Sequence, residues 1–166
     1  MAADATTILG AVVSGLTSIN ATLATTDPTT QPAPILERQL SADPDVKVLP
    51  GWSPGDPVPC WIVSMAKPEE NDRQSSTEHR SVDYGARIDY VRAYVPGEES
   101  EDAIIRDVRQ LVRKTLDMPQ LSGAAQVWST IWKDGPPYQR KTYGDTVLTV
   151  SVQEATFRVM EPRGTP

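Results

Sequence analysis

The segment from residue 81 to residue 157 constrains the fold most, because its side-chain pattern changes period along the chain. Residues 81–95 alternate, with Val82, Tyr84, Ala86, Ile88, Tyr90 and Tyr94 on one side and Ser81, Asp83, Arg87 and Asp89 on the other. A period of two predicts a half-buried strand. Pro96 and Gly97 end this pattern, and a period near 3.6 follows. The order strand, turn, helix, strand, turn, strand predicts a compact α+β fold.

The helical pattern covers Ser100–Asp117 and has a clear apolar stripe. Its members are Ile104, Ile105, Val108, Leu111, Val112 and Leu116. Acidic residues crowd the start of this helix (Glu98, Glu99, Glu101 and Asp102), and Arg113 and Lys114 lie near its end. That polarity complements the helix dipole, so the acidic cluster needs no catalytic explanation.

Three further strands are predicted on the same grounds. Cys60–Ala66 is a short apolar strand, and Ala125–Lys133 places Trp128 and Trp132 on one face. The last strand, Thr146–Met160, changes the parity of its apolar residues midway, which predicts a β-bulge near Gln153–Ala155. Tyr138–Gly144 reads as a polar loop. We therefore expect a mostly antiparallel four-stranded sheet packed by two helices.

The N-terminal segment predicts the second helix. An apolar stripe runs from Ile8 to Leu23, and no charged residue occurs between Asp4 and Asp27. The opposite side offers Ser14, Thr17 and Ser18, so either a partner covers this side or the side faces solvent. The acid before the apolar run, and the run's shortness and Ser/Thr/Gly content, argue against a signal peptide or a membrane span. A cytoplasmic product is expected.

The length predicts a single domain over residues 1–166, with three irregular parts. Residues 24–59 read as an extended Pro-rich arm or loop, residues 67–80 as a flexible polar loop and residues 161–166 as a tail. The polar loop contains Glu69, Glu70, Asp72 and Arg73. It is either a solvated hairpin loop or a finger that becomes ordered on a partner.

Residues suited to catalysis or metal binding are few. The single cysteine, Cys60, reads as a small buried hydrophobe, and the single histidine, His79, lies in the polar loop. Asp83 and Asp89 flank Arg87 on one strand face, which is typical of surface ion pairs. We therefore expect no catalytic residues, no metal site and no cofactor. A net charge of −6 argues against broad binding to a phosphate backbone.

Three arginines, Arg87, Arg92 and Arg158, come near one another if their strands pair. They read either as solvated sheet edges or as an intersubunit ion-pair set. Together with Ser14, Thr17, Ser18 and the charged residues of the polar loop, they are the candidate interface residues.

The order of elements resembles that of the tail-terminator (tail-completion) proteins of long-tailed bacteriophages. The resemblance covers roughly Thr6 to Met160. It rests on the uncharged first helix, the strand Cys60–Ala66, the alternating strand Val82–Val95 and the acidic-to-basic helix. Leu121-Ser122-Gly123 then leads into a Trp-bearing strand and the final strand Val147–Val159. The Pro-rich segment before Cys60 is longer than this family leads us to expect.

The resemblance implies a structural virion protein, assembled in the host cytoplasm. Such proteins form a ring, commonly of six subunits, that caps the head-proximal end of the tail tube and joins it to the neck or connector. Genomic DNA passes through the ring without specific binding, and no membrane is involved. The alternatives are another head–tail connector protein (head-completion or stopper) and a non-viral α+β adaptor. A small hydrolase is least favoured, given one histidine and one cysteine.

Overall fold

The computed structural model describes residues 5–26, 33–39, 51–71, 75–94, 101–117, 127–133 and 138–162. Its elements are α1 (Ala5–Thr26), β1 (Ile35–Gln39), β2 (Cys60–Met65), β3 (Glu69–Asn71), β4 (His79–Ala93), α2 (Glu101–Leu116), β5 (Val127–Lys133), β6 (Gln139–Tyr143) and β7 (Thr146–Pro162). The strands form one seven-stranded sheet in the order β1-β2-β4-β7-β5, with β3 on β4 and β6 on β7. The predicted α+β class with two helices is confirmed.

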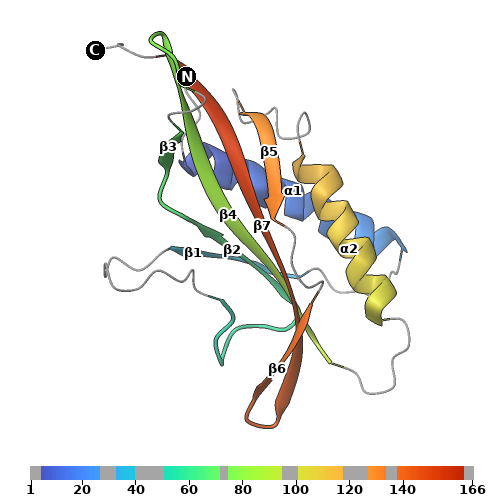
Figure 1. Cartoon of the computed structure of the whole chain (residues 1–166). Helices are drawn as coiled ribbons and strands as arrows, with labels where there is room; N and C mark the ends of the chain where they lie inside the picture. The colour runs from blue at the N-terminus through green and yellow to red at the C-terminus, as the bar shows by residue number, and fades with distance from the viewer. Residues whose placement is uncertain are drawn as a thin grey trace.

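The sheet is larger and more mixed than the predicted four-stranded one. The four predicted strands are β2, β4, β5 and β7, but β1, β3 and β6 add to them, and β1 runs parallel to β2. Each added strand has at most five residues. Two of the three are almost wholly polar, so no apolar alternation marks them. They form because their main chains pair with neighbouring strands, especially where β4 and β7 extend beyond the other long strands (Figure 1).

Four segments that were predicted to be irregular contain regular structure. Helix α1 continues to Thr26 and β1 lies inside the expected 24–59 arm, whereas residues 27–32 and 40–50 lie outside the described residues. The expected loop 67–80 contains β3 and the start of β4. Strand β7 extends through residue 162 into the expected tail, and Tyr138–Gly144 is mostly the strand β6 rather than a loop.

The long strands β4 and β7 pair with each other at the centre of the sheet. Their antiparallel register is continuous from His79 opposite Pro162 to Ala93 opposite Leu148, so the bulge predicted in β7 is wrong. The apolar parity changes because the two halves of β7 bury opposite faces. Val150 points to the face away from the helices, and Phe157 to the helix face. A strand covered on different sides along its length needs no extra residue.

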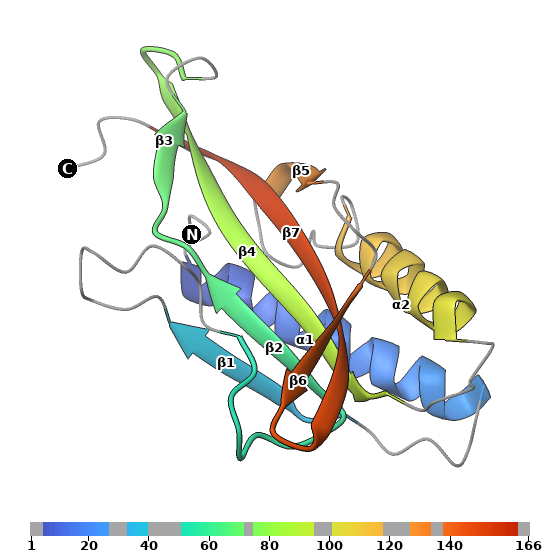
Figure 2. The ribbon, with the colours of Figure 1, turned by 60° about the horizontal axis from the view of Figure 1, so that its bottom comes forward.

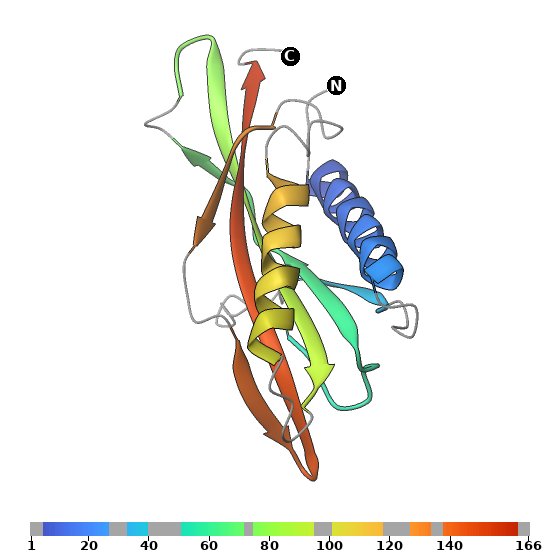
Figure 3. The same cartoon turned by 90° about the vertical axis from the view of Figure 1, so that its right-hand side faces the viewer.

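The main core lies between the sheet and the two helices. Helices α1 and α2 lie side by side on the same face of the sheet (Figure 3). The predicted stripes are buried there: Ile8, Val12, Leu16 and Ile19 from α1, and Ile105, Val108, Val112 and Leu116 from α2. Trp61 and Phe157 are the largest fully buried sheet residues beneath them. Each such side chain contributes about 1.5–3 kcal/mol relative to exposure.

A second, smaller core lies on the far face of the sheet, opposite the helices. It contains Cys60, Ile62, Val91, Leu148 and Val150, with Leu36, Trp52, Tyr143 and Val152 packed against them. Strand β6 and the segment around Trp52 approach this end of the sheet (Figure 2). Trp52 and Tyr143 stack with ring centroids 4.8 Å apart. The prediction of a buried Cys60 is confirmed, since the residue is fully buried.

In the first half of β7, the apolar side chains face away from the helices. Polar residues therefore occupy the helix face of this half. Thr149, Ser151 and Gln153 are buried there. Arg109 of α2 donates from Nη1 to Ser151 Oγ at 3.2 Å and to the Val152 carbonyl at 2.9 Å. Gln153 Nε2 in turn donates to the Arg109 carbonyl at 3.4 Å. These bonds satisfy buried polar groups that would otherwise destabilise the fold.

The two tryptophans of β5 do not share a face as predicted. The register of β5 against β7 shifts between Val127 and Ser129, so Trp128 occupies an irregular position. Trp128 is 36% exposed, whereas Trp132 packs against the main core. An extra residue in one strand reverses the facing of all residues beyond it.

Helix α1 is the one helix among the described residues with the length and composition to cross a membrane. The apolar segment is thus longer than the run on which the sequence prediction against a span was based. Core helices of soluble proteins and signal sequences can have the same length and composition. In this fold, one side of α1 is buried against the sheet.

Candidate functional site

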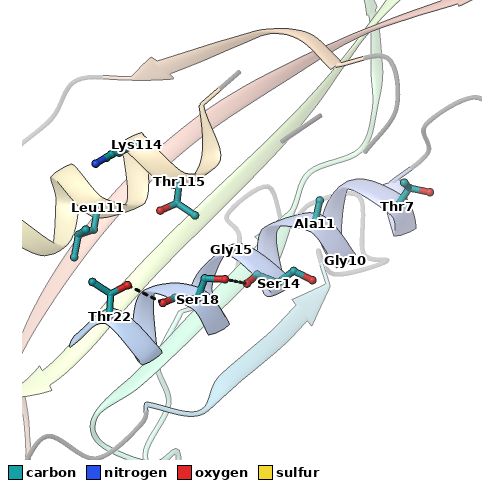
Figure 4. A pocket seen from close by; sticks show the side chains of 10 residues that line it. All are labelled: Thr7, Gly10, Ala11, Ser14, Gly15, Ser18, Thr22, Leu111, Lys114 and Thr115. Carbon is teal, nitrogen blue, oxygen red and sulfur yellow. Dashed lines mark hydrogen bonds between the residues drawn. The ribbon is translucent and has the colours of Figure 1, made fainter. Parts of the chain in front are cut away.

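A groove with a defined lining lies between α1 and α2 (Figure 4). It encloses about 720 Å³. Its walls are Thr7, Gly10, Ala11, Ser14, Gly15, Ser18 and Thr22 from α1, and Leu111, Lys114 and Thr115 from α2. Lys114 is the charged member of this lining, so the groove presents small neutral side chains and hydroxyls.

The hydroxyl groups along α1 are turned back onto their own helix. Thr17 Oγ1 donates to the Val13 carbonyl at 2.9 Å, and Ser18 Oγ donates to the Ser14 carbonyl at 3.2 Å. Thr22 Oγ1 donates likewise to the Ser18 carbonyl at 3.1 Å. Because these donors are already used, the exposed side of α1 behaves as a small, weakly polar surface. Such a surface permits close approach of another protein element but offers no acid, base or nucleophile.

Only part of this groove is indicated by the residue pattern of the sequence. Ser14 and Ser18 line it, whereas Thr17 is exposed beside it. Gly10 and Gly15, and the α2 wall around Thr115, were missed. Small residues spaced three to five apart along α1 are the signal that could have indicated close helix packing.

We predict opposite effects for two glycine substitutions on α1. A Cβ on Gly15 would lie 2.5 Å from Cδ2 of the buried Leu116, whereas a Cβ on Gly10 would meet nothing within 4 Å. Gly10→Ala should stabilise the protein by about 0.5–1 kcal/mol through helix propensity. Gly15→Ala should destabilise it by about 1–2 kcal/mol, because overpacking exceeds that gain. Urea unfolding of both variants, monitored by circular dichroism, tests this; equal shifts would contradict it.

The three candidate arginines do not form one cluster. Arg87 pairs with Asp89 of its own strand, and Arg158 pairs with Asp83 across the β4–β7 ladder at 3.4 Å. Both pairs lie on the far face. Arg92 has the opposite parity in β4, opposite Thr149, and therefore lies on the helix face. Within the described chain, Arg87 and Arg158 form ion pairs inside one subunit.

The polar-loop candidates are divided between a strand and undescribed positions. Glu69 and Glu70 lie in β3, opposite Asp83 and Val82 of β4, and both are exposed. Asp72 and Arg73 lie outside the described residues. The two glutamates therefore stand on a short strand that pairs with the first part of β4.

The single histidine and the single cysteine lie on different strands, β4 and β2. His79 is exposed at the start of β4. Among the residues that the structure describes, no group of three or more His, Cys, Asp or Glu residues is placed to hold a metal ion. The Cys60 thiol is buried, and this burial raises its pKa to about 11. It is therefore protonated and weakly nucleophilic at neutral pH.

We predict that Cys60 resists alkylation in the native protein. At pH 8, iodoacetamide should modify it at least about tenfold more slowly than in urea-unfolded protein, because both burial and the raised pKa suppress the thiolate. Mass spectrometry of timed samples measures this directly. Native modification as fast as that of the unfolded chain would show that the far-face core opens readily.

Comparisons with known proteins add no family. No protein-family model matches the chain, and no curated protein matches it with significant similarity.

Proposed function

We propose that this protein is a structural virion protein of the tail-terminator type. It forms a ring that caps the head-proximal end of a phage tail tube and joins the tube to the neck. DNA passes through the centre of the ring. The elements on which the resemblance rests occur in the expected order: α1, β2, β4, α2, β5 and β7.

The observation that carries the proposal is the neutral exposed side of α1. This helix has 22 residues, and neither its first nor its last turn carries a charge of the kind that supports a solvent-facing helix. The sequence from residue 5 to residue 26 has no charged side chain at all. A helix exposed to water on one side normally carries Lys and Glu there. Coverage by another protein subunit explains their absence.

The net charge supports a passage for DNA rather than a site that binds DNA. The chain carries a formal charge of −6, so an assembled ring repels the polyanion and lets it slide. A ring also needs two different contact surfaces on each subunit, because its contacts join unlike patches. The α1–α2 groove is one surface that meets this requirement.

Purified protein mixed with tail tubes tests the function. We expect light scattering to give an assembly of about six copies. Electron microscopy should show one ring at one end of each tube and no further tube growth. Binding to DNA-filled heads instead of tubes would identify a head-completion or stopper protein. A monomer at high concentration that leaves tube ends bare would contradict the proposal.

A further inference from the structure

The α1–α2 groove has small neutral walls and one charged residue. The two helices meet at Gly15, where a Cβ would lie 2.5 Å from Leu116 Cδ2, whereas a Cβ at Gly10 would meet nothing within 4 Å. Lys114, the charged residue of the lining, is exposed and makes no ion pair within the described part of the chain. The groove therefore offers open space beside Gly10 and a positive charge that another molecule can meet.

The β6–β7 hairpin projects from one end of the sheet, beyond both helices (Figures 1 and 3). Tyr143 pairs with Thr146, so the turn between the strands consists of Gly144 and Asp145. Gly144 has a φ of +62°, a left-handed backbone conformation that glycine adopts without strain. The tip is therefore a tight turn, as narrow as two paired strands, which lie about 4.8 Å apart.

The hairpin tip presents small side chains and one acid. Residues 144–146 are all exposed, and Asp145 is the charged residue among them. Like Lys114, Asp145 makes no ion pair with another described residue. The two bases of β6, Arg140 and Lys141, lie further from the turn. The charge at the tip is therefore negative.

Two aromatic contacts hold the hairpin in position on its own subunit. The Tyr143 ring, next to the turn, lies 4.8 Å from the Trp52 ring, measured between centroids. Further along β6, the Arg140 guanidinium lies 4.3 Å from the centre of the Tyr94 ring. A hairpin that is held in this way loses little conformational entropy when it docks, which favours binding through its tip.

We propose that the β6–β7 hairpin tip of one copy enters the α1–α2 groove of the next copy, with Asp145 beside Lys114. This inference names a subunit contact of the proposed ring and in that respect rests on the proposed function. The single acid of the tip complements the single base of the groove, and small side chains on both sides permit close approach.

Two further observations favour the hairpin tip as the occupant. Helix α1 of another copy has no charged residue from position 5 to position 26, so it would leave Lys114 without a partner. The tip and the groove are also different surfaces of one subunit. A contact between them therefore repeats head to tail from copy to copy, which is the kind of contact that a ring requires.

Charge reversal at the two positions tests this contact. Lys114→Glu and Asp145→Lys should each associate at least about tenfold more weakly than the wild type in sedimentation velocity at low salt, because like charges then meet. The chain that carries both changes should recover association, since the two signs are exchanged. An equimolar mixture of the single variants should recover it too, because each tip then finds a groove of opposite charge. Misfolded variants would not complement each other in this way.

Matched controls make the same changes of charge on α2 outside the groove. Arg106 and Asp107 are exposed and do not line the groove, so Arg106→Glu and Asp107→Lys should associate like the wild type. The proposal is overturned if the single variants at Lys114 and Asp145 associate normally. It is also overturned if neither the double variant nor the mixture recovers association.

Binding to tail tubes separates this contact from the proposed function. If Lys114→Glu self-associates normally but no longer binds tubes, another virion protein occupies the groove and the contact is rejected. Rings that follow the charge rule but leave tube ends bare would reject the proposed function alone. Rings that cap tubes whatever the charge at the two positions would reject this contact alone. A wild-type chain that stays monomeric at high concentration would contradict both.

Discussion

Replacing Asp89 by alanine should lower the free energy of unfolding by about 3–5 kcal/mol, because it leaves a largely buried guanidinium without its partner. Asp89 is 1% exposed. Arg87 holds it with two parallel hydrogen bonds, Nε to Oδ1 at 2.8 Å and Nη2 to Oδ2 at 2.9 Å. Gly51 lies over the pair, since a Cβ there would be 3.5 Å from both side chains. Urea unfolding monitored by tryptophan fluorescence measures the loss.

A double variant separates the loss of the pair from the loss of one partner. Burial raises the pKa of the Asp89 carboxyl, and the Arg87 guanidinium opposes that rise without cancelling it. The buried charge is therefore costly even when paired. Arg87→Met with Asp89→Leu should recover most of the stability, because it removes both charges and keeps the volume. Asp83→Ala, which breaks the more exposed pair with Arg158, should cost less than about 1 kcal/mol. Equal losses for Asp83→Ala and Asp89→Ala would refute this account.

Long periodic segments of this chain could be predicted from sequence because burial selects their side chains. Strand β4 and helix α2 each keep one buried face over many residues, and the structure has both nearly where the pattern places them. Strand β3 could not be found this way, because its three residues are held by main-chain pairing with β4. A pattern of side chains carries no signal for such a strand.

The parity change in β7 illustrates a second limit. A sequence pattern reports that residues are buried but not which layer covers them. Leu148 and Phe157 are both fully buried, yet one packs in the far-face core and the other in the core beneath the helices. The Arg109 contacts that fill the helix face beside Ser151 join residues more than 40 positions apart. Only the assembled fold places them together.

The candidate interface likewise combines a feature that is local in the sequence with features that only the assembled fold creates. The neutral side of α1 was visible in the sequence because a missing charge is a local property. The groove wall contributed by Leu111 and Thr115 arises only when distant segments meet. The polar loop was interpreted from composition alone, whereas pairing with β4 decides where Glu69 and Glu70 stand.

Replacing Trp61 by alanine should destabilise the protein by about 3–5 kcal/mol, as for other buried aromatic truncations. The Trp61 ring is 1% exposed, and its centroid lies 4.6 Å from that of Tyr90. Its Nε1 donates to Asn20 Oδ1 at 2.9 Å, and Asn20 Nδ2 donates to the Ala33 carbonyl at 2.8 Å. The substitution therefore opens a cavity. It also breaks the hydrogen-bonded link that joins β2, through Asn20 of α1, to Ala33 before β1.

The same substitution at Trp128 provides the control, because chemistry is matched and only burial differs. Trp128 is 36% exposed at the edge strand β5, so Trp128→Ala should cost less than about 1 kcal/mol in chemical unfolding of the monomer. Its effect should instead appear in self-association, because burial of an exposed aromatic ring between copies favours assembly. Sedimentation velocity should show Trp128→Ala folded but weakened in assembly. Comparable unfolding losses for the two variants would contradict this prediction and mean that Trp128 supports the subunit itself.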